Sequence, residues 1–258
     1  MTHGSHWECI VPDIEEFFET HFSEIVQNSN VIGESKEYGY NIATEKEQEN
    51  VIHTLLYPQD SSSPYKILTQ IVNKQLWTSY PVLNFGMTHE VIITDINDEG
   101  NFVEAQISCK LKRYPDFGFT FFDTMYHKNK SLYIIGNTYS FLFNGFMYSC
   151  GENQFANTKI PNAEIDDIWI DKNTVVCLAS ENGDMDDYKV ISPILDVESF
   201  DSDLGIKMYK IRIILLQDDI CFDIPVLIAE QNLKDGFIPH EGDSINGSLW
   251  LCGMMKAL

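Results

Sequence analysis

Hydrophobic and polar residues follow one period before Pro81 and another after it. In the first 85 residues, apolar side chains recur every three or four positions and predict helices over residues 12–26, 44–56 and 64–76. Pro12 and the acidic residues after it suit a helix N-terminus, and Thr44 with Glu47 matches a capping box. We therefore expect at least two helices here, with the following side chains largely buried: Phe17, Phe18, Ile25, Leu55 and Leu56.

From Thr88 onward apolar and polar residues alternate, and this period of two predicts β-strands. Between the expected strands, residues 124–132 and 229–233 have an amphipathic pattern that predicts short helices. Strands are expected over residues 88–95, 101–110, 117–122, 167–170, 174–179 and 220–228.

One arrangement of these elements occurs twice, in residues 91–148 and again in residues 189–255. Each copy closes with an apolar strand that follows a glycine, Gly136 or Gly242, which can adopt positive φ in a tight turn. Three strands, a helix and a further strand is an order typical of OB-type Greek-key barrels. Two unrelated β-meanders with ordinary glycine turns would give a similar pattern.

These patterns predict an α+β fold with a helical N-terminal region followed by two OB-like β-barrel modules. The expected divisions are residues 1–85 for the acidic helical region, 86–180 for the first module and 181–258 for the second. The middle block is nearly neutral, whereas the two flanking blocks carry most of the negative charge.

The composition predicts a soluble, cytoplasmic protein. Hydrophobic residues make up 44% of the 258 positions, enough for a sizeable core. No apolar run reaches the roughly 18 residues that a membrane span needs, and the N-terminus lacks the pattern of a signal peptide. The six cysteines are widely spaced without a CxxC pair, which favours reduced, mostly buried thiols.

Net charge narrows the choice of partners. The chain carries 39 acidic and 17 basic residues, for a formal charge of -22, and its only arginines are Arg113 and Arg212. Because binding to phosphate backbones depends on clustered cations, double-stranded nucleic acid and anionic membranes are disfavoured. The leading hypothesis is a non-catalytic binding protein, such as an inhibitor or immunity-type factor, that engages a basic protein partner. Its partner-binding residues are expected in an acidic surface loop: Asp184, Asp186 and Asp187.

A local cluster of cations supports an alternative function. An OB-type module could use basic and aromatic side chains to bind an oligonucleotide or a small ligand. Solvated lysines at strand ends would account for the same cluster without any ligand. The candidate ligand-binding residues are Lys110, Lys112, Arg113, Tyr126, Lys128 and Lys130.

Catalytic motifs give little support for an enzyme, although they leave the question open. The chain lacks GxSxG, Walker A, GxGxxG and HExxH motifs. Asp123 and Asp223 follow apolar strand residues and leave an unrecognised hydrolase as a second alternative, but nothing in the sequence brings them together. The acidic loop over residues 181–187 lacks the regular ligand frame of a calcium site. We therefore predict no catalytic residue, metal or cofactor, and the sequence does not indicate an oligomeric state.

Overall fold

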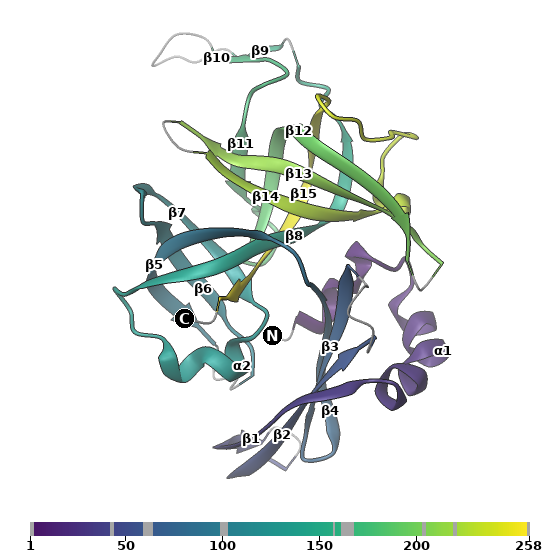
Figure 1. Cartoon of the computed structure of the whole chain (residues 1–258), viewed down its shortest axis with the longest axis vertical. Helices are drawn as coiled ribbons and strands as arrows, with labels where there is room; N and C mark the ends of the chain where they lie inside the picture. Colours follow the sequence, from purple (N-terminus) through teal and green to yellow (C-terminus); the bar gives the residue numbers. More distant parts are fainter. Residues whose placement is uncertain are drawn as a thin grey trace.

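The fold consists mostly of β-strands arranged in two main sheets (Figure 1). The computed structural model describes residues 3–41, 44–58, 64–98, 103–156, 158–160, 168–202, 205–218 and 221–256. A sheet of four strands lies with helix α1 below a larger sheet of nine strands in the view of Figure 1. A two-stranded ribbon, β9 (Thr158–Ile160) with β10 (Ile168–Ile170), projects at the opposite end.

The N-terminal region is predominantly β, so the predicted helical region is wrong apart from its first helix. A short 3-10 helix η1 (His3–Cys9) precedes α1 (Ile14–Gln27), where the Asp13 carboxylate accepts the Glu16 N–H at 2.9 Å as an N-cap. Four antiparallel strands follow in the order β1 (Asn30–Asn41), β2 (Lys46–Tyr57), β3 (Tyr65–Val72) and β4 (Gln75–Leu83).

Burial of polar side chains explains why the apolar residues of β2 have the spacing of a helix. The strand buries Asn50, Ile52 and Thr54 on one face, so its inward residues are not the apolar ones alone. Asn50 accepts a hydrogen bond from Asn73 Nδ2 at 2.8 Å and donates to the Gly39 carbonyl at 3.1 Å. These partners are distant in sequence, and strand pairing therefore overrides the helical spacing of the apolar residues.

The second mistaken helix, residues 64–76, contains β3, which is buried on both faces. Seven of its eight residues are buried, so the strand shows no alternation of apolar and polar positions. A buried run of this kind cannot be distinguished from a helix by its period. Of the five side chains predicted to be buried, Phe17, Ile25 and Leu55 are buried, whereas Phe18 and Leu56 are partly exposed.

The large sheet has the order β11-β12-β13-β14-β8-β15-β7-β6-β5 and closes on itself through two further pairings, β8 with β5 and β12 with β15. The result is two closed rings of paired strands, β5-β6-β7-β15-β8 and β12-β13-β14-β8-β15. Their strands are β5 (Met87–Asn97), β6 (Gln106–Leu111), β7 (Tyr114–Asp123), β8 (Thr138–Glu152), β11 (Val176–Ala179), β12 (Asp187–Asp201), β13 (Lys207–Gln217), β14 (Cys221–Ala229) and β15 (Ser244–Met255).

The two predicted glycine turns have the same conformation and the same bonding. Gly136 has φ 89° and donates to the Ile93 carbonyl at 2.8 Å, while Gly242 has φ 87° and donates to the Ile194 carbonyl at 2.9 Å. Short helices also stand in corresponding places: α2 (Tyr126–Asn129) and η2 (Lys130–Leu132) between β7 and β8, and η3 (Glu230–Asn232) between β14 and β15. Each half thus repeats the same order of elements.

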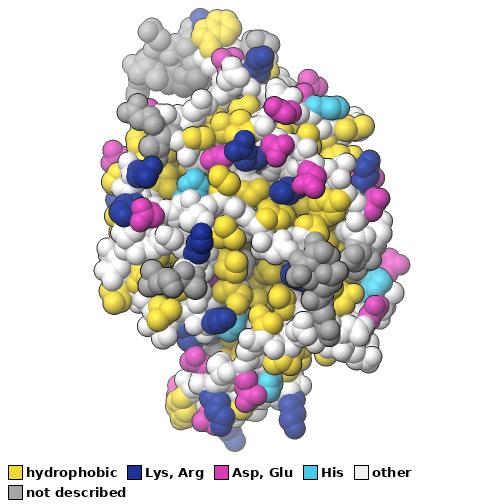
Figure 2. Space-filling model, viewed as in Figure 1, with side chains coloured by type: hydrophobic (Ala, Val, Ile, Leu, Met, Phe, Trp, Pro, Cys, Tyr) yellow, Lys and Arg dark blue, Asp and Glu magenta, His cyan; other side chains and the backbone are white. Residues whose placement is uncertain are grey.

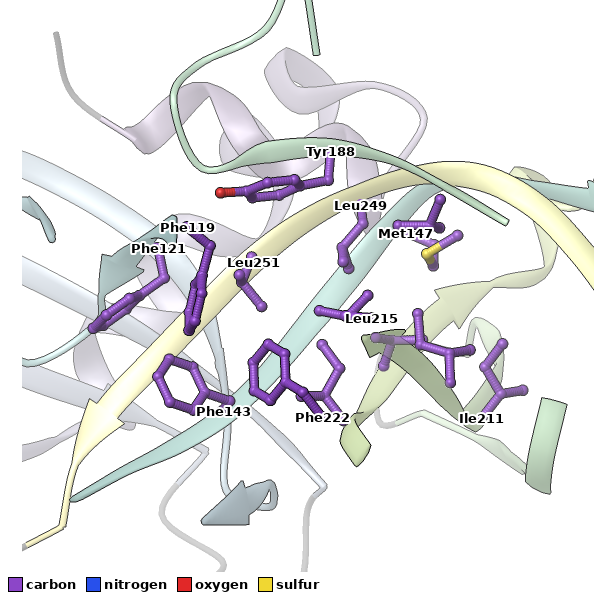
Figure 3. Packing of buried hydrophobic residues seen from close by; sticks show 14 of the residues in the cluster. Phe119, Phe121, Phe143, Met147, Tyr188, Ile211, Leu215, Phe222, Leu249 and Leu251 are labelled. Atoms are coloured by element: carbon purple, nitrogen blue, oxygen red, sulfur yellow. The ribbon is translucent and has the colours of Figure 1, made fainter. Parts of the chain in front are cut away.

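Two separate barrel modules are nevertheless not supported, because β8 and β15 belong to both rings. One hydrophobic cluster extends through the two halves. Figure 3 shows Phe143 and Met147 of β8 and Leu249 and Leu251 of β15 in the middle of this cluster, with the following residues around them: Phe119 and Phe121 of β7, Ile211 and Leu215 of β13, and Phe222 of β14.

A second hydrophobic cluster joins the N-terminal region to the outside of the large sheet. Trp7 and Ile10 near η1 and Tyr80 of β4 pack with Phe122 of β7 and Trp250 of β15. The Trp7 indole N–H also donates to the Ser79 carbonyl at 2.7 Å. All six cysteines are free, and four of them are buried. Among the described residues, no helix has the length and hydrophobicity needed to cross a bilayer.

Candidate binding groove

An apolar groove lies between the β6–β7 hairpin and the start of the second half of the chain. Its volume is about 520 Å³, within the range typical of small-ligand sites. Leu178 and Met185 contribute exposed apolar surface, with 62% and 46% of their respective surfaces accessible. The lining residues are Thr94, Ser108, Cys109, Lys110, Phe117, Gly118, Phe119, Thr120, Cys177, Leu178, Ala179, Met185 and Tyr188.

The groove exists because two different strands, β12 and then β7, pair with successive parts of β15. Its N-terminal part, up to Trp250, pairs antiparallel with β12, whereas Cys252 and Gly253 pair parallel with the end of β7. Since β7 and β12 meet β15 at successive positions and then diverge, a wedge opens between them. In the part of the chain that the structure describes, no strand pairs with residues 114–121 of β7 on the side away from β6.

Tyr188 closes the narrow end of this wedge. Its hydroxyl accepts the Thr120 N–H at 2.7 Å and donates to the Thr120 carbonyl at 2.9 Å. In Figure 3 the Tyr188 ring extends toward the β7 side of the cluster. One phenol thus occupies both backbone positions that a neighbouring strand would use at Thr120.

The groove thiols are poor nucleophiles. Burial raises the pKa of Cys177 to about 12 and raises that of Cys109 well above its ordinary value. Because the thiolate is the reactive form, both sulfurs act as small apolar groups near neutral pH. The groove chemistry favours binding over covalent catalysis.

The three acids predicted to bind a partner have different environments. Asp186 is fully buried and accepts hydrogen bonds from Gln106 Nε2 at 2.5 Å and from the Trp250 indole at 2.8 Å. Asp187 is partly buried and accepts from the Tyr148 hydroxyl at 3.1 Å. Asp184 is also partly buried, with 30% of its side chain exposed. A partner that contacts this folded surface could therefore reach Asp184 but not Asp186.

Asp184 and Asp187 also take part in a hydrogen-bond network with His6 of the N-terminal segment, Asp184 directly and Asp187 through Tyr148. The His6 ring lies 3.2 Å from Asp184 through Nε2 and hydrogen-bonds the Tyr148 hydroxyl through Nδ1. Burial raises the pKa of Asp187 to about 6 and raises that of Tyr148 as well. This network connects η1 to β8 and to the start of β12, so the acidic loop has a structural role that its composition did not indicate.

The predicted ligand-binding residues do not form one cluster. Lys110 lines the groove, whereas Tyr126, Lys128 and Lys130 lie in α2 and η2, beyond the opposite end of β7. Tyr126 is buried and donates to Asp98 at 3.2 Å, so its ring is not an open stacking surface.

Two of the predicted cations are also neutralised by neighbours. Lys112 pairs with Glu90 at 2.7 Å, and Lys130 pairs with Glu37 at 2.8 Å. Arg113 and Lys128 are exposed. The cations available to an oligonucleotide are therefore divided between the two ends of β7.

The two strand-end aspartates have unrelated partners. Asp123 is fully buried and accepts from the Tyr133 hydroxyl at 2.5 Å and from the Met125 N–H at 3.0 Å. Burial raises the pKa of Asp123 to about 7, although both hydrogen bonds oppose the shift. Asp223 instead pairs with Arg212 at 3.2 Å. This arrangement does not form the carboxylate pair of a hydrolase.

The raised pKa of Asp123 predicts a specific dependence of stability on pH. An aspartate ionises near pH 3.9 in the unfolded chain, so its folded-state contribution is complete below that pH and is lost as the pH rises toward about 7. The difference in free energy of unfolding between wild type and Asp123→Asn should change with pH by up to about 1.4 kcal/mol per unit in this window. Urea unfolding at several pH values measures it. Asp116→Asn, at an exposed position, serves as control, and equal slopes for all three proteins would contradict the prediction.

Some important residues had no visible signature in the sequence. Tyr188 acts on Thr120, 68 positions away, and His6 contacts Tyr148 and Asp184 across still longer separations. Only the position of Tyr188 directly after an acidic run, at the start of a strand pattern, could have drawn attention to it.

Neither a metal site nor a similarity to known proteins points to another functional site. No group of three or more His, Cys, Asp or Glu side chains suited to a metal ion occurs among the described residues. The chain matches no protein-family model, and the searches for similar curated proteins and solved structures found no match.

Proposed function

We propose that this protein is a non-catalytic binding protein whose apolar groove receives a segment of a basic protein partner. The observation that carries the proposal is the groove itself. It has a volume of about 520 Å³ and largely apolar walls, which include the exposed side chains of Leu178 and Met185. Exposed apolar surface of this kind is typical of interaction sites.

Charge around the groove supports a basic occupant. Asp95, Asp116 and Glu181 are exposed, and each lies within two residues of a lining residue. Lys110 is the only charged side chain among the described lining residues. The whole chain carries -22, and complementary charge accelerates encounter while it discriminates against acidic partners. On the face shown in Figure 2, acidic and basic side chains are interspersed among exposed hydrophobic ones.

A finer proposal concerns the fold. We propose that each ring corresponds to an OB-type unit and that the two units exchange their closing strands, β8 and β15. The parallel pairings of β7 with β15 and of β14 with β8 support this arrangement, as do the corresponding turns at Gly136 and Gly242. In OB-type proteins, ligands often bind over the second and third strands. In the first ring these strands would be β6 and β7, which form one wall of the groove.

The proposal can be tested with a probe peptide of alternating lysine and valine, (Lys-Val)4, and its charge-reversed twin (Glu-Val)4. The lysine peptide should bind, and its affinity should fall about tenfold between about 0.01 M and about 0.15 M ionic strength, where the Debye length shortens from about 30 Å to about 8 Å. The glutamate peptide should not bind. Calorimetric titration measures both.

A double variant then tests which acidic residues attract the peptide. Asp116→Lys with Glu181→Lys should slow association more than it speeds dissociation, because charges at the rim act mainly on encounter. Asp196→Lys, at an exposed position outside the groove lining, is the matched control. Equal binding of the two peptides, or no binding of either at low salt, would refute the proposed function.

A small apolar ligand is the second candidate, since the groove volume also suits one. The oligonucleotide alternative stays a prediction with less support, because Lys112 and Lys130 are paired and Tyr126 is buried. Salt-dependent binding of a short single-stranded oligonucleotide that is lost in Lys110→Glu would favour it over the leading proposal.

A further inference from the structure

Among the residues that the structure describes, no strand pairs with the groove-facing edge of β7 before Phe122. The N–H and carbonyl of Thr120 both point away from β6, toward the Tyr188 hydroxyl. Because backbone groups alternate in direction along a strand, and Thr120, Phe119 and Gly118 pair with successive residues of β6, those of Gly118 point the same way. Only Phe122 and Asp123, at the end of β7, pair with β15. Hence the edge beyond Thr120 offers the N–H and carbonyl of Gly118 to a further strand.

Gly118 makes this edge accessible. It is exposed and lines the groove, and without a side chain it permits close approach of another backbone. A β-carbon placed at Gly118 would lie 3.6 Å from the Cys109 carbonyl oxygen, an ordinary contact. The glycine is therefore not required by packing of the hairpin, and a β-carbon can be introduced there without a clash.

We infer that an extended segment of the basic partner adds to β7 as a strand, an inference that rests on the function proposed above. Main-chain hydrogen bonds to Gly118 would give affinity, and pockets for alternate side chains would give specificity. One set of side chains would meet Phe117, Leu178 and Met185 in the groove. The other set would lie near the exposed acids of the rim, which suits lysine or arginine.

Charge also argues against other occupants and other sites. A second copy of this chain would bring -22 against -22, so self-association at this edge is disfavoured. The free edge of β11 is only four residues long. A smaller groove of about 310 Å³ on the other side of Leu178 is lined by Lys189 and Lys234, which suit a basic segment poorly.

Backbone methylation tests strand addition directly. Two versions of (Lys-Val)4 are compared with the parent peptide, one N-methylated on every lysine and the other on every valine. Since alternate residues direct their N–H groups to opposite sides of a strand, methylation of at least one set should weaken binding about tenfold or more, equivalent to about 1.4 kcal/mol. If the parent binds in a salt-dependent way but both methylated peptides bind equally well, strand addition is refuted while the proposed function stands.

Variants of the protein provide the second arm. Gly118→Leu should weaken binding of (Lys-Val)4 at least about tenfold because its side chain fills the groove beside the edge, whereas Gly118→Ala should change it little. Thermal unfolding verifies that both variants are folded. Sedimentation at several protein concentrations tests for self-association: a dimer lost in Gly118→Leu would show that a second copy is the occupant and would overturn the inference. Unchanged peptide affinity in a folded Gly118→Leu protein would overturn it equally.

Discussion

Replacing Gly247 with alanine should destabilise the protein by about 3 kcal/mol. Gly247 lies in β15, opposite Cys150 of β8 on one side and Val190 of β12 on the other. A β-carbon at this position would overlap the Ser149 carbonyl oxygen and the Met147 methyl group. The backbone oxygen belongs to a strand that is shared by both rings, so it cannot move without disturbing both.

Gly118→Ala is the matched control for this experiment, since its β-carbon meets only ordinary contacts at 3.6 Å or more. Urea unfolding should place that variant within about 0.5 kcal/mol of wild type. If Gly247→Ala were as stable as Gly118→Ala, the close approach of β8 and β15, and with it the shared central ladder, would be incorrect.

Removal of the Asp186 carboxylate should have an effect of similar size. Asp186→Ala removes the carboxylate that accepts hydrogen bonds from the Trp250 indole N–H and the Gln106 amide. An unsatisfied buried donor costs about 1–3 kcal/mol, so the expected loss in free energy of unfolding is about 2–4 kcal/mol. Asp186→Asn retains one acceptor oxygen, so its free energy of unfolding should lie between those of wild type and Asp186→Ala.

An exposed acid provides the comparison for Asp186. Asp196 lies in β12 and its side chain is exposed, so Asp196→Ala should change stability by no more than about 0.5 kcal/mol. Chemical denaturation, followed by the fluorescence of Trp250 and the other tryptophans, measures all three variants. Equal stability of Asp186→Ala and Asp196→Ala would show that the 181–187 loop does not hold the strands together.

The sequence predicted the β-rich part of the fold better than the N-terminal part, for physical reasons. Gly136 and Gly242 act locally, through positive φ, and so their turns could be predicted from neighbouring residues. Strands β2 and β3 depend on pairing with distant residues, and the buried polar face of β2 and the doubly buried β3 conceal the period of two. The sharing of β8 and β15 by the two rings likewise depends on long-range pairing.

The candidate site was harder to predict than the fold. The acidic loop was identified, but its composition could not show that Asp186 is buried beneath Trp250. Lys110 was identified as a possible ligand-binding residue and lines the groove, whereas Tyr126 is buried. The groove arises where two strands diverge from β15, and its key side chain, Tyr188, acts on a residue of the other half. No local pattern in the sequence encodes that geometry.

Amide hydrogen exchange at Gly118, measured by NMR with and without (Lys-Val)4 at low salt, tests the central proposal most directly. If the peptide adds to β7, exchange at Gly118 should slow by about tenfold or more, because its N–H group becomes hydrogen-bonded. The Phe119 amide, which faces β6, should change little. Unchanged exchange at Gly118 under conditions where the peptide is bound would contradict strand addition in the groove.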